Sequence, residues 1–184
     1  QPVLLILSCL AFCSTFFGVP LITMLPVFAK DVFQLGPRGY SGLLACTGVG
    51  AVTGALIVAA LGNFSNKGRI ALGLQVLFGA MVILFSFSPV LWLSLTALLL
   101  AGIALVAVFA FMTSLVQLQV PESMRGRVVS IYMMAFRGGT PLGSLTTGFL
   151  VSHWSPSWVL AGNGLVMCAV GTTFLLLRQR VRLD

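Results

Sequence analysis

The amino-acid sequence predicts an all-α integral membrane protein with six transmembrane helices. Of the 184 residues, 59% are hydrophobic and only 7% are charged, and the mean hydropathy is +1.11. A soluble domain of this length needs far more charged residues to cover its surface. The few charged residues also gather between long apolar stretches, which is the pattern of helices that cross a bilayer.

The composition argues against other functional classes. The net charge of +7 could indicate a nucleic-acid partner, but the basic residues lie between apolar spans, so we expect no nucleic acid. With one histidine and no pair of acids, the chain lacks the cluster that an integral-membrane enzyme needs. We therefore predict no enzymatic activity, no cofactor and no metal site. The four cysteines all lie within apolar spans without a metal-binding pattern, and they are Cys9, Cys13, Cys46 and Cys168.

The first predicted span covers residues 3–29, which contain no charged residue. Within it, Gly18-Val19-Pro20 and Pro26 are expected to bend or interrupt the helix. A proline has no backbone N–H to donate, so it frees a carbonyl four residues earlier. Gly18 and Pro20 are thus candidate hinge residues. The segment from Lys30 to Gly39 is the predicted loop that follows, and the second span covers about residues 40–61.

Four further spans follow from the remaining apolar stretches. Residues 70–120 contain no charged residue, which is too long for one helix, and Ser86-Phe87-Ser88-Pro89 divides them. Polar side chains are rare in the third and sixth spans, apart from Gln75 and Asn163. The four predicted spans cover residues 70–87, about 90–119, about 128–151 and 157–177.

The basic residues predict the orientation in the membrane. Six spans place both ends of the segment on one side, which holds seven basic residues against two on the other. The positive-inside rule then places both ends in the cytoplasm, with the protein in the cell inner (plasma) membrane. Trp92, Trp154 and Trp158 all fall at the opposite, outer interface, where indole rings prefer to lie. Two predicted cytoplasmic loops carry candidate motif residues: Gly62, Asn66, Lys67, Gly68 and Arg69 in the first, and Glu122, Arg125, Gly126 and Arg127 in the second. For Arg125 and Arg127 the alternatives are contacts with anionic headgroups and a cytoplasmic gate contact.

Two pairs of glycines predict close helix packing. Gly50 and Gly54 lie four residues apart in the second span, and Gly139 and Gly143 lie four apart in the fifth. Small residues at this spacing let helix backbones approach each other inside lipid. Because the pattern recurs three helices later, we also predict an internal repeat of three plus three helices.

Arg137 is the one charged residue that cannot be placed in a loop. It lies ten residues beyond Arg127, which is roughly 15 Å along a helix and near the bilayer midplane. A central arginine costs about 2.5–3.5 kcal/mol on insertion scales, so a partner is expected. The three acids, Asp31, Glu122 and Asp184, all lie in loops or the tail. The partner is then a carboxylate outside this sequence, an anionic cargo group, or backbone carbonyls and water.

The residues after Arg137 predict a hinge in the fifth span. Pro141 cannot donate to the carbonyl of Arg137, and Gly138 and Gly139 are flexible. Together with Gly143 they form the candidate hinge. The alternatives are a purely structural arginine and a kink that takes no part in motion.

One long run carries a resemblance to a known family. It comprises Val120-Pro121-Glu122-Ser123-Met124-Arg125-Gly126-Arg127-Val128, then Ser130-Ile131-Tyr132, then Arg137-Gly138-Gly139-Thr140-Pro141-Leu142-Gly143. With the six spans and the glycine-and-base loop after the second, it resembles the C-terminal half of a major facilitator superfamily transporter, and within it the enterobactin-exporter and macrolide-efflux group. The loop from Gly62 to Arg69 is similar to the superfamily's glycine-acid-base motif, although Asn66 stands where an acid is usual.

The resemblance implies helices seven to twelve of a twelve-helix protein that exports small organic molecules, such as siderophores or drugs, by alternating access. Spans one and four would line the cavity, spans two and five would meet the N-terminal half of the same polypeptide, and spans three and six would face lipid. Proton antiport needs a carboxylate within the membrane, so any coupling acid is expected in that other half. The absence of an initiator Met agrees with a piece of a longer chain. The alternative is a truncated or scaffold six-helix membrane protein that does not transport.

Overall fold

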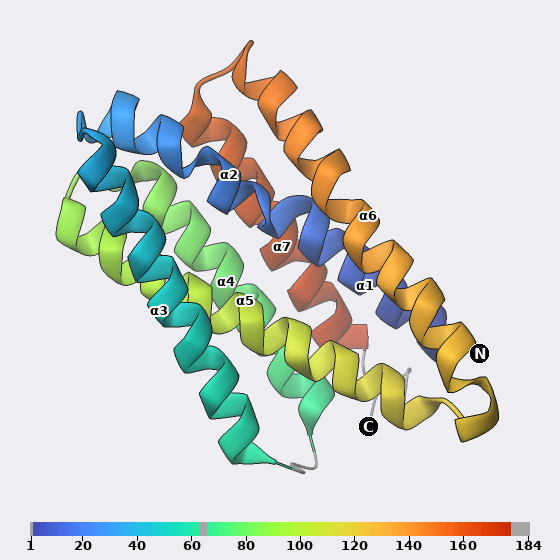
Figure 1. The fold of residues 1–184 in the computed structure, drawn as a ribbon. Helices are drawn as coiled ribbons and strands as arrows, with labels where there is room; N and C mark the ends of the chain where they lie inside the picture. The colour runs from blue at the N-terminus through green and yellow to red at the C-terminus, as the bar shows by residue number, and fades with distance from the viewer. Residues whose placement is uncertain (1, 63–65, 178–184) are drawn as a thin grey trace.

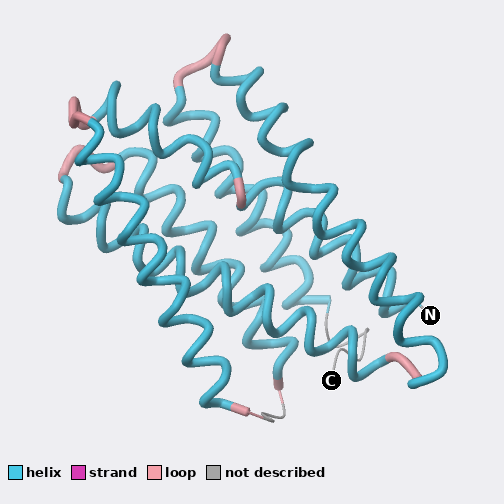
Figure 2. Tube along the Cα trace, in the orientation of Figure 1, coloured by secondary structure: helices cyan, strands magenta, loops and turns pink. Residues whose placement is uncertain are grey.

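The computed structural model describes residues 2–62 and 66–177, and within these ranges the chain is a bundle of helices joined by short connections (Figures 1 and 2). The elements in chain order are α1 (Pro2–Gly18), α2 (Pro20–Val27), the π-helical turn η1 (Phe28–Val32), α3 (Pro37–Leu61), α4 (Lys67–Phe87), α5 (Leu91–Gln119), the 3₁₀ turn η2 (Glu122–Met124), α6 (Arg125–Val151) and α7 (Pro156–Leu177).

The first predicted span consists of α1, α2 and η1. The helix breaks at Val19, between the two predicted hinge residues Gly18 and Pro20. The Val19 N–H still donates to the Thr15 carbonyl at 3.2 Å, but Pro20 has no N–H to donate to the Phe16 carbonyl. One carbonyl of the span therefore loses its usual helical partner at the break.

The predicted loop from Lys30 to Gly39 is wrong in its extent. A π-helical turn carries the helix through residue 32, with the Phe33 N–H donating to the Phe28 carbonyl at 3.0 Å. α3 then begins already at Pro37, because proline suits the first helical turn, where its missing N–H costs nothing. Only residues 33–36 connect the two helices.

The predicted cytoplasmic loops are also shorter than expected. Lys67, Gly68 and Arg69 form the first turn of α4, and residues 125–127 form the first turn of α6. A membrane helix can begin in the headgroup layer, where its charged side chains stay hydrated. Charge therefore marked the end of the apolar stretch and not the end of the helix.

Glycines lie at the contacts of three helix pairs. α3 packs on α5, where Gly50 and Gly54 lie against the backbone of Leu99 and Ile103. A Cβ atom on Gly54 would come within 2.5 Å of the Ile103 carbonyl oxygen, so only glycine permits this approach.

The second pair, α1 and α6, repeats this arrangement. Gly139 lies against Phe12 and Thr15, and a Cβ atom on Gly143 would collide with the carbonyl oxygen of Phe16. The glycines are four residues apart on one helix, and the opposing backbone positions are four apart on the other, as in α3 and α5.

The third pair, α4 and α7, is reciprocal. A Cβ atom on Gly79 would come within 2.5 Å of the Gly164 carbonyl oxygen, and one on Gly164 would come within 2.7 Å of the Gly79 carbonyl oxygen. In the predicted repeat, α1 corresponds to α5, α3 to α6, and α4 to α7. Exchanging the corresponding helices converts the α3/α5 pair into the α6/α1 pair, and it converts the α4/α7 pair into itself. The pairing therefore has the symmetry of the predicted repeat of three plus three helices.

Five of the six predicted spans are long and apolar enough to cross a membrane, and α6 is not among them. With 27 residues α6 has sufficient length, but Arg137 and a run of glycine, serine and threonine make it too polar. It is also poorly covered, since its buried residues are only Tyr132, Gly139, Gly143 and Thr147. The prediction of a sixth span thus lacks the support of hydropathy.

The reciprocal glycine contact generates a test of stability. We expect Gly79→Leu to lower the free energy of unfolding by about 1–3 kcal/mol, because a side chain there must push α4 away from α7. The control is Gly73→Leu on the same helix, where a Cβ atom meets nothing within 4 Å. Thermal unfolding of the purified full-length protein in detergent measures both. Equal melting temperatures for the two variants would contradict the close contact.

Candidate functional site

Arg137 lies near the middle of α6 with its side chain exposed. Twelve residues of α6 precede it and fourteen follow it, which correspond to roughly 18 Å and 21 Å of helix. The residues of α6 that face α1, Gly139 and Gly143, lie on a different side of the helix. The guanidinium therefore projects away from the α1 contact, on the uncovered side of the bundle.

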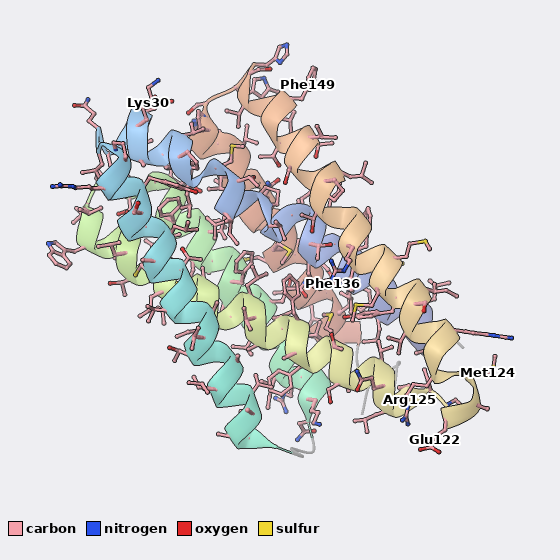
Figure 3. All side chains as sticks on the ribbon, viewed as in Figure 1. Lys30, Glu122, Met124, Arg125, Phe136 and Phe149 are labelled. Carbon is pink, nitrogen blue, oxygen red and sulfur yellow. The ribbon has the colours of Figure 1, made fainter. Side chains whose placement is uncertain are left out.

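No hydrogen bond or ion pair of the Arg137 side chain occurs within residues 2–62 and 66–177. The two acids in these ranges lie far along the chain from it, Asp31 in η1 and Glu122 in η2. The Glu122 carboxylate instead approaches Arg125 at 3.9 Å on the surface (Figure 3). In the described part of the chain, the charge of Arg137 is thus not neutralised.

The two predicted hinge segments meet each other. Pro20 leaves the Phe16 carbonyl without its helical donor, and that same carbonyl lies against Gly143 of α6. The Cα–H groups of a glycine are weak donors to such an oxygen. α6 itself remains one helix through Pro141. Gly18 lies against Leu105 and Phe78, each 3.2 Å from the position of a Cβ atom, whereas Gly138 has open space.

An aromatic cluster beside Arg137 joins α6 to α5. The ring of Phe136, which is labelled in Figure 3, packs edge-on against Phe109 at 4.7 Å between centroids. One turn earlier, the buried Tyr132 hydroxyl lies 3.4 Å from the Thr113 hydroxyl. Sequence reasoning missed this cluster, although two aromatic residues four positions apart on one helix were a signal for a shared contact.

The polar residues of the apolar spans are buried between helices. Asn163 of α7 donates from its amide to the Thr147 hydroxyl of α6 at 3.2 Å. Gln75 of α4 is fully buried, and its carbonyl oxygen lies 3.4 Å from the Ser14 hydroxyl of α1. Its amide nitrogen is buried without a partner in the described residues. The Ser14 hydroxyl donates to the Leu10 carbonyl at 2.7 Å.

The residues of the two predicted cytoplasmic motifs occupy the end of α3 and the starts of α4 and α6. Gly62 ends α3 with φ +56°, a conformation that favours glycine. The Lys67 ammonium donates to the Ser114 hydroxyl at 3.1 Å and so links α4 to α5. Gly68 is buried, while Asn66, Arg69, Gly126 and Arg127 are exposed. Exposed cations at this end are available to headgroups or to another part of the protein.

The unpartnered amide generates a second stability test. We expect Gln75→Met to leave the melting temperature unchanged or to raise it, because the substitution removes a buried N–H group that gains no hydrogen bond. The comparison variant is Asn163→Leu, which loses the hydrogen bond from Asn163 to Thr147. It should lower the free energy of unfolding by about 0.6 kcal/mol, the average for such bonds in membrane bundles. Thermal unfolding in detergent measures both. A larger loss for Gln75→Met than for Asn163→Leu would show that the amide has a partner.

Comparison with known proteins adds one finding to this geometry. A family of the major facilitator type, described as transmembrane secretion effector, has a model that matches residues 4–183. A search of curated proteins gave no match.

Proposed function

Since the chain belongs to the transmembrane secretion effector family, we propose that it exports small organic molecules, such as siderophores or drugs, across the plasma membrane. In this proposal the chain forms the C-terminal six helices of a twelve-helix transporter that works by alternating access. The observation that carries the proposal is Arg137, a mid-helix cation on the uncovered side of α6 that has no partner among the described residues.

The exposed faces of α3 and α6 support a contact with an N-terminal half. Only 22% of the residues in the apolar stretch of α3 are buried, against 56% in that of α5. The paired glycines do not form this contact, because they face α5 and α1 within the described chain. The opposite faces of the same two helices are the ones left uncovered. Protein on the uncovered face of α6 explains how so polar a helix is stable in a membrane.

A partner for Arg137 then comes from outside the described chain. A lone arginine at the centre of a bilayer costs about 2.5–3.5 kcal/mol, and a carboxylate on the N-terminal half or an anionic group of the cargo would offset that cost. Alternating access moves one half against the other around such a site. An ion pair that forms in one state and opens in the other would couple Arg137 to the transport cycle. Any proton-coupling acid is placed by this proposal in the N-terminal half.

The proposal predicts the effect of neutralising Arg137. In cells that express the full-length protein, a panel of siderophores and drugs first identifies an exported compound. We expect Arg137→Gln to reduce its export at least about tenfold, the equivalent of about 1.4 kcal/mol, and Arg137→Lys to retain part of it because the charge remains. Arg38→Gln, an exposed cation at the far end, is the control. Normal export by a normally expressed Arg137→Gln would contradict the role of Arg137. Export of no compound by the wild type would contradict the function.

The positive-inside distribution predicts the orientation. Single cysteines are introduced at Ser123, after α5, and at His153, after α6, in a protein whose own cysteines are replaced. We expect a membrane-impermeant thiol reagent added to intact cells to label position 153 and not position 123. Permeabilised cells should show labelling at both positions. The reverse pattern in intact cells would place the basic turns outside and refute the orientation.

A further inference from the structure

A pocket of 370 Å³ lies between η1 and the start of α3, at the end of the bundle away from Arg125 and Glu122. Figure 3 shows Lys30 at this end. Pro26 and Lys30 line one side of the pocket, and Gly36 and Tyr40 line the other. Its volume falls in the range of small-molecule sites, which is about 300–1,000 Å³.

The backbone between η1 and α3 builds this pocket. The Leu35 N–H donates to the Ala29 carbonyl at 2.7 Å, which turns the chain sharply after the π-helical turn. Gln34 adopts φ +51°, an unfavourable conformation for a residue other than glycine. π-helical turns and such backbone conformations gather at binding sites. The shape of the pocket is thus set by hydrogen-bonded backbone and not by side-chain rotamers alone.

The charge lining the pocket is positive. Lys30 is the only charged residue in the lining, and its side chain is exposed. The neighbouring Asp31 and Arg38 do not line it. α3 begins at the pocket, but its first residue, Pro37, has no N–H, and the N–H groups of Gly39 and Tyr40 donate to the Gly36 carbonyl at 2.9 Å and 3.4 Å. The positive charge at the pocket therefore comes from Lys30. The rest of the wall is largely apolar, from residues such as Ala29 and Leu35.

We propose that this pocket binds the headgroup of an anionic phospholipid. Its phosphate would lie at the Lys30 ammonium, and its glycerol backbone and first acyl carbons would lie against Pro26 and Leu35. A lipid fits better than a free anion because the wall is apolar opposite the cation, and because the pocket opens at the end of helices that cross a bilayer. The site is independent of the exported compound and of the orientation, and rests only on the membrane location of the chain.

The test is lipid binding to the purified full-length protein, measured by native mass spectrometry during titration with dioleoylphosphatidylglycerol or dioleoylphosphatidylcholine. We expect tighter binding of phosphatidylglycerol, and about fivefold weaker binding of it by Lys30→Gln, the change that one lysine near a headgroup provides. Asp31→Asn is the control for charge, since this residue lies next to Lys30 but outside the pocket lining. It should bind at least as tightly as the wild type.

A steric variant tests the same pocket independently of charge. A Cβ atom meets nothing within 4 Å at either Gly36 or Gly42, so both accept phenylalanine without a backbone clash, but only Gly36 lines the pocket. We expect Gly36→Phe to abolish the preference for phosphatidylglycerol and Gly42→Phe to keep it. The melting temperature of each lipid-free variant verifies its fold. If Gly36→Phe does not fold, Lys30→Glu replaces it as the test, because Lys30 is exposed and tolerates substitution. This variant should bind phosphatidylglycerol more weakly than Lys30→Gln.

Three results would overturn the proposal. The first is equal binding of the two lipids by the wild type, and the second is unchanged binding of phosphatidylglycerol by the Lys30 and Gly36 variants. The third is a Lys30-dependent rise in melting temperature with inorganic phosphate alone but none with phosphatidylglycerol, which would show a site for a free anion. Loss of export by Arg137→Gln leaves this proposal unaffected, because the two sites use different residues at different depths.

Discussion

Close approach of helix backbones is the interaction on which this bundle depends. Lipid is as apolar as leucine, so burial of apolar side chains gives helices little reason to associate within a membrane. The three pairs α3/α5, α4/α7 and α1/α6 instead bring glycines onto opposing backbone, at Gly54, Gly79 and Gly143 for example. Two of these pairs use one side of α3 and of α6. The opposite sides therefore stay available for contacts outside the described chain.

The contact of α1 with α6 also resolves the cost of the break in the first span. A free carbonyl inside lipid is expensive because no water is present to satisfy it. The Phe16 carbonyl, freed by Pro20, is covered by Gly143, where a larger residue would not fit. α6 is thus held by its small residues on one side, which allows the polar residues around Arg137 to occupy the other. The position of the arginine follows from how α6 is attached.

The sequence predicted the membrane helices well because the bilayer thickness sets the length of each apolar stretch and excludes charged residues from it. It placed Arg137 near mid-helix for the same reason, and the family match confirms the superfamily resemblance, while the finer efflux group remains a prediction. Spacing of Gly50 and Gly54 predicted close packing but could not name α5 as the partner, since spacing describes one helix and not its neighbour. Lys30 was predicted to lie in a loop because the first charged residue was taken as the end of the helix. No sequence pattern predicts the π-helical turn that contains it. The pocket between η1 and α3 could not be predicted for that reason.

The symmetry of the helix pairs has a consequence for how such a bundle can arise. A unit of three helices that meets a second copy of itself makes one reciprocal interface, of the α4/α7 kind, in which the same surface is used twice. It also makes one heterologous interface, in which each copy contributes a different surface, and this interface occurs twice, as α3/α5 and α6/α1. Duplication and fusion of one gene segment would supply all three helix contacts from only two types of interface. Once fused, the copies could diverge at residues outside these interfaces. Arg137 lies near the middle of α6, whereas α3, the corresponding helix of the other copy, has no charged residue after Arg38.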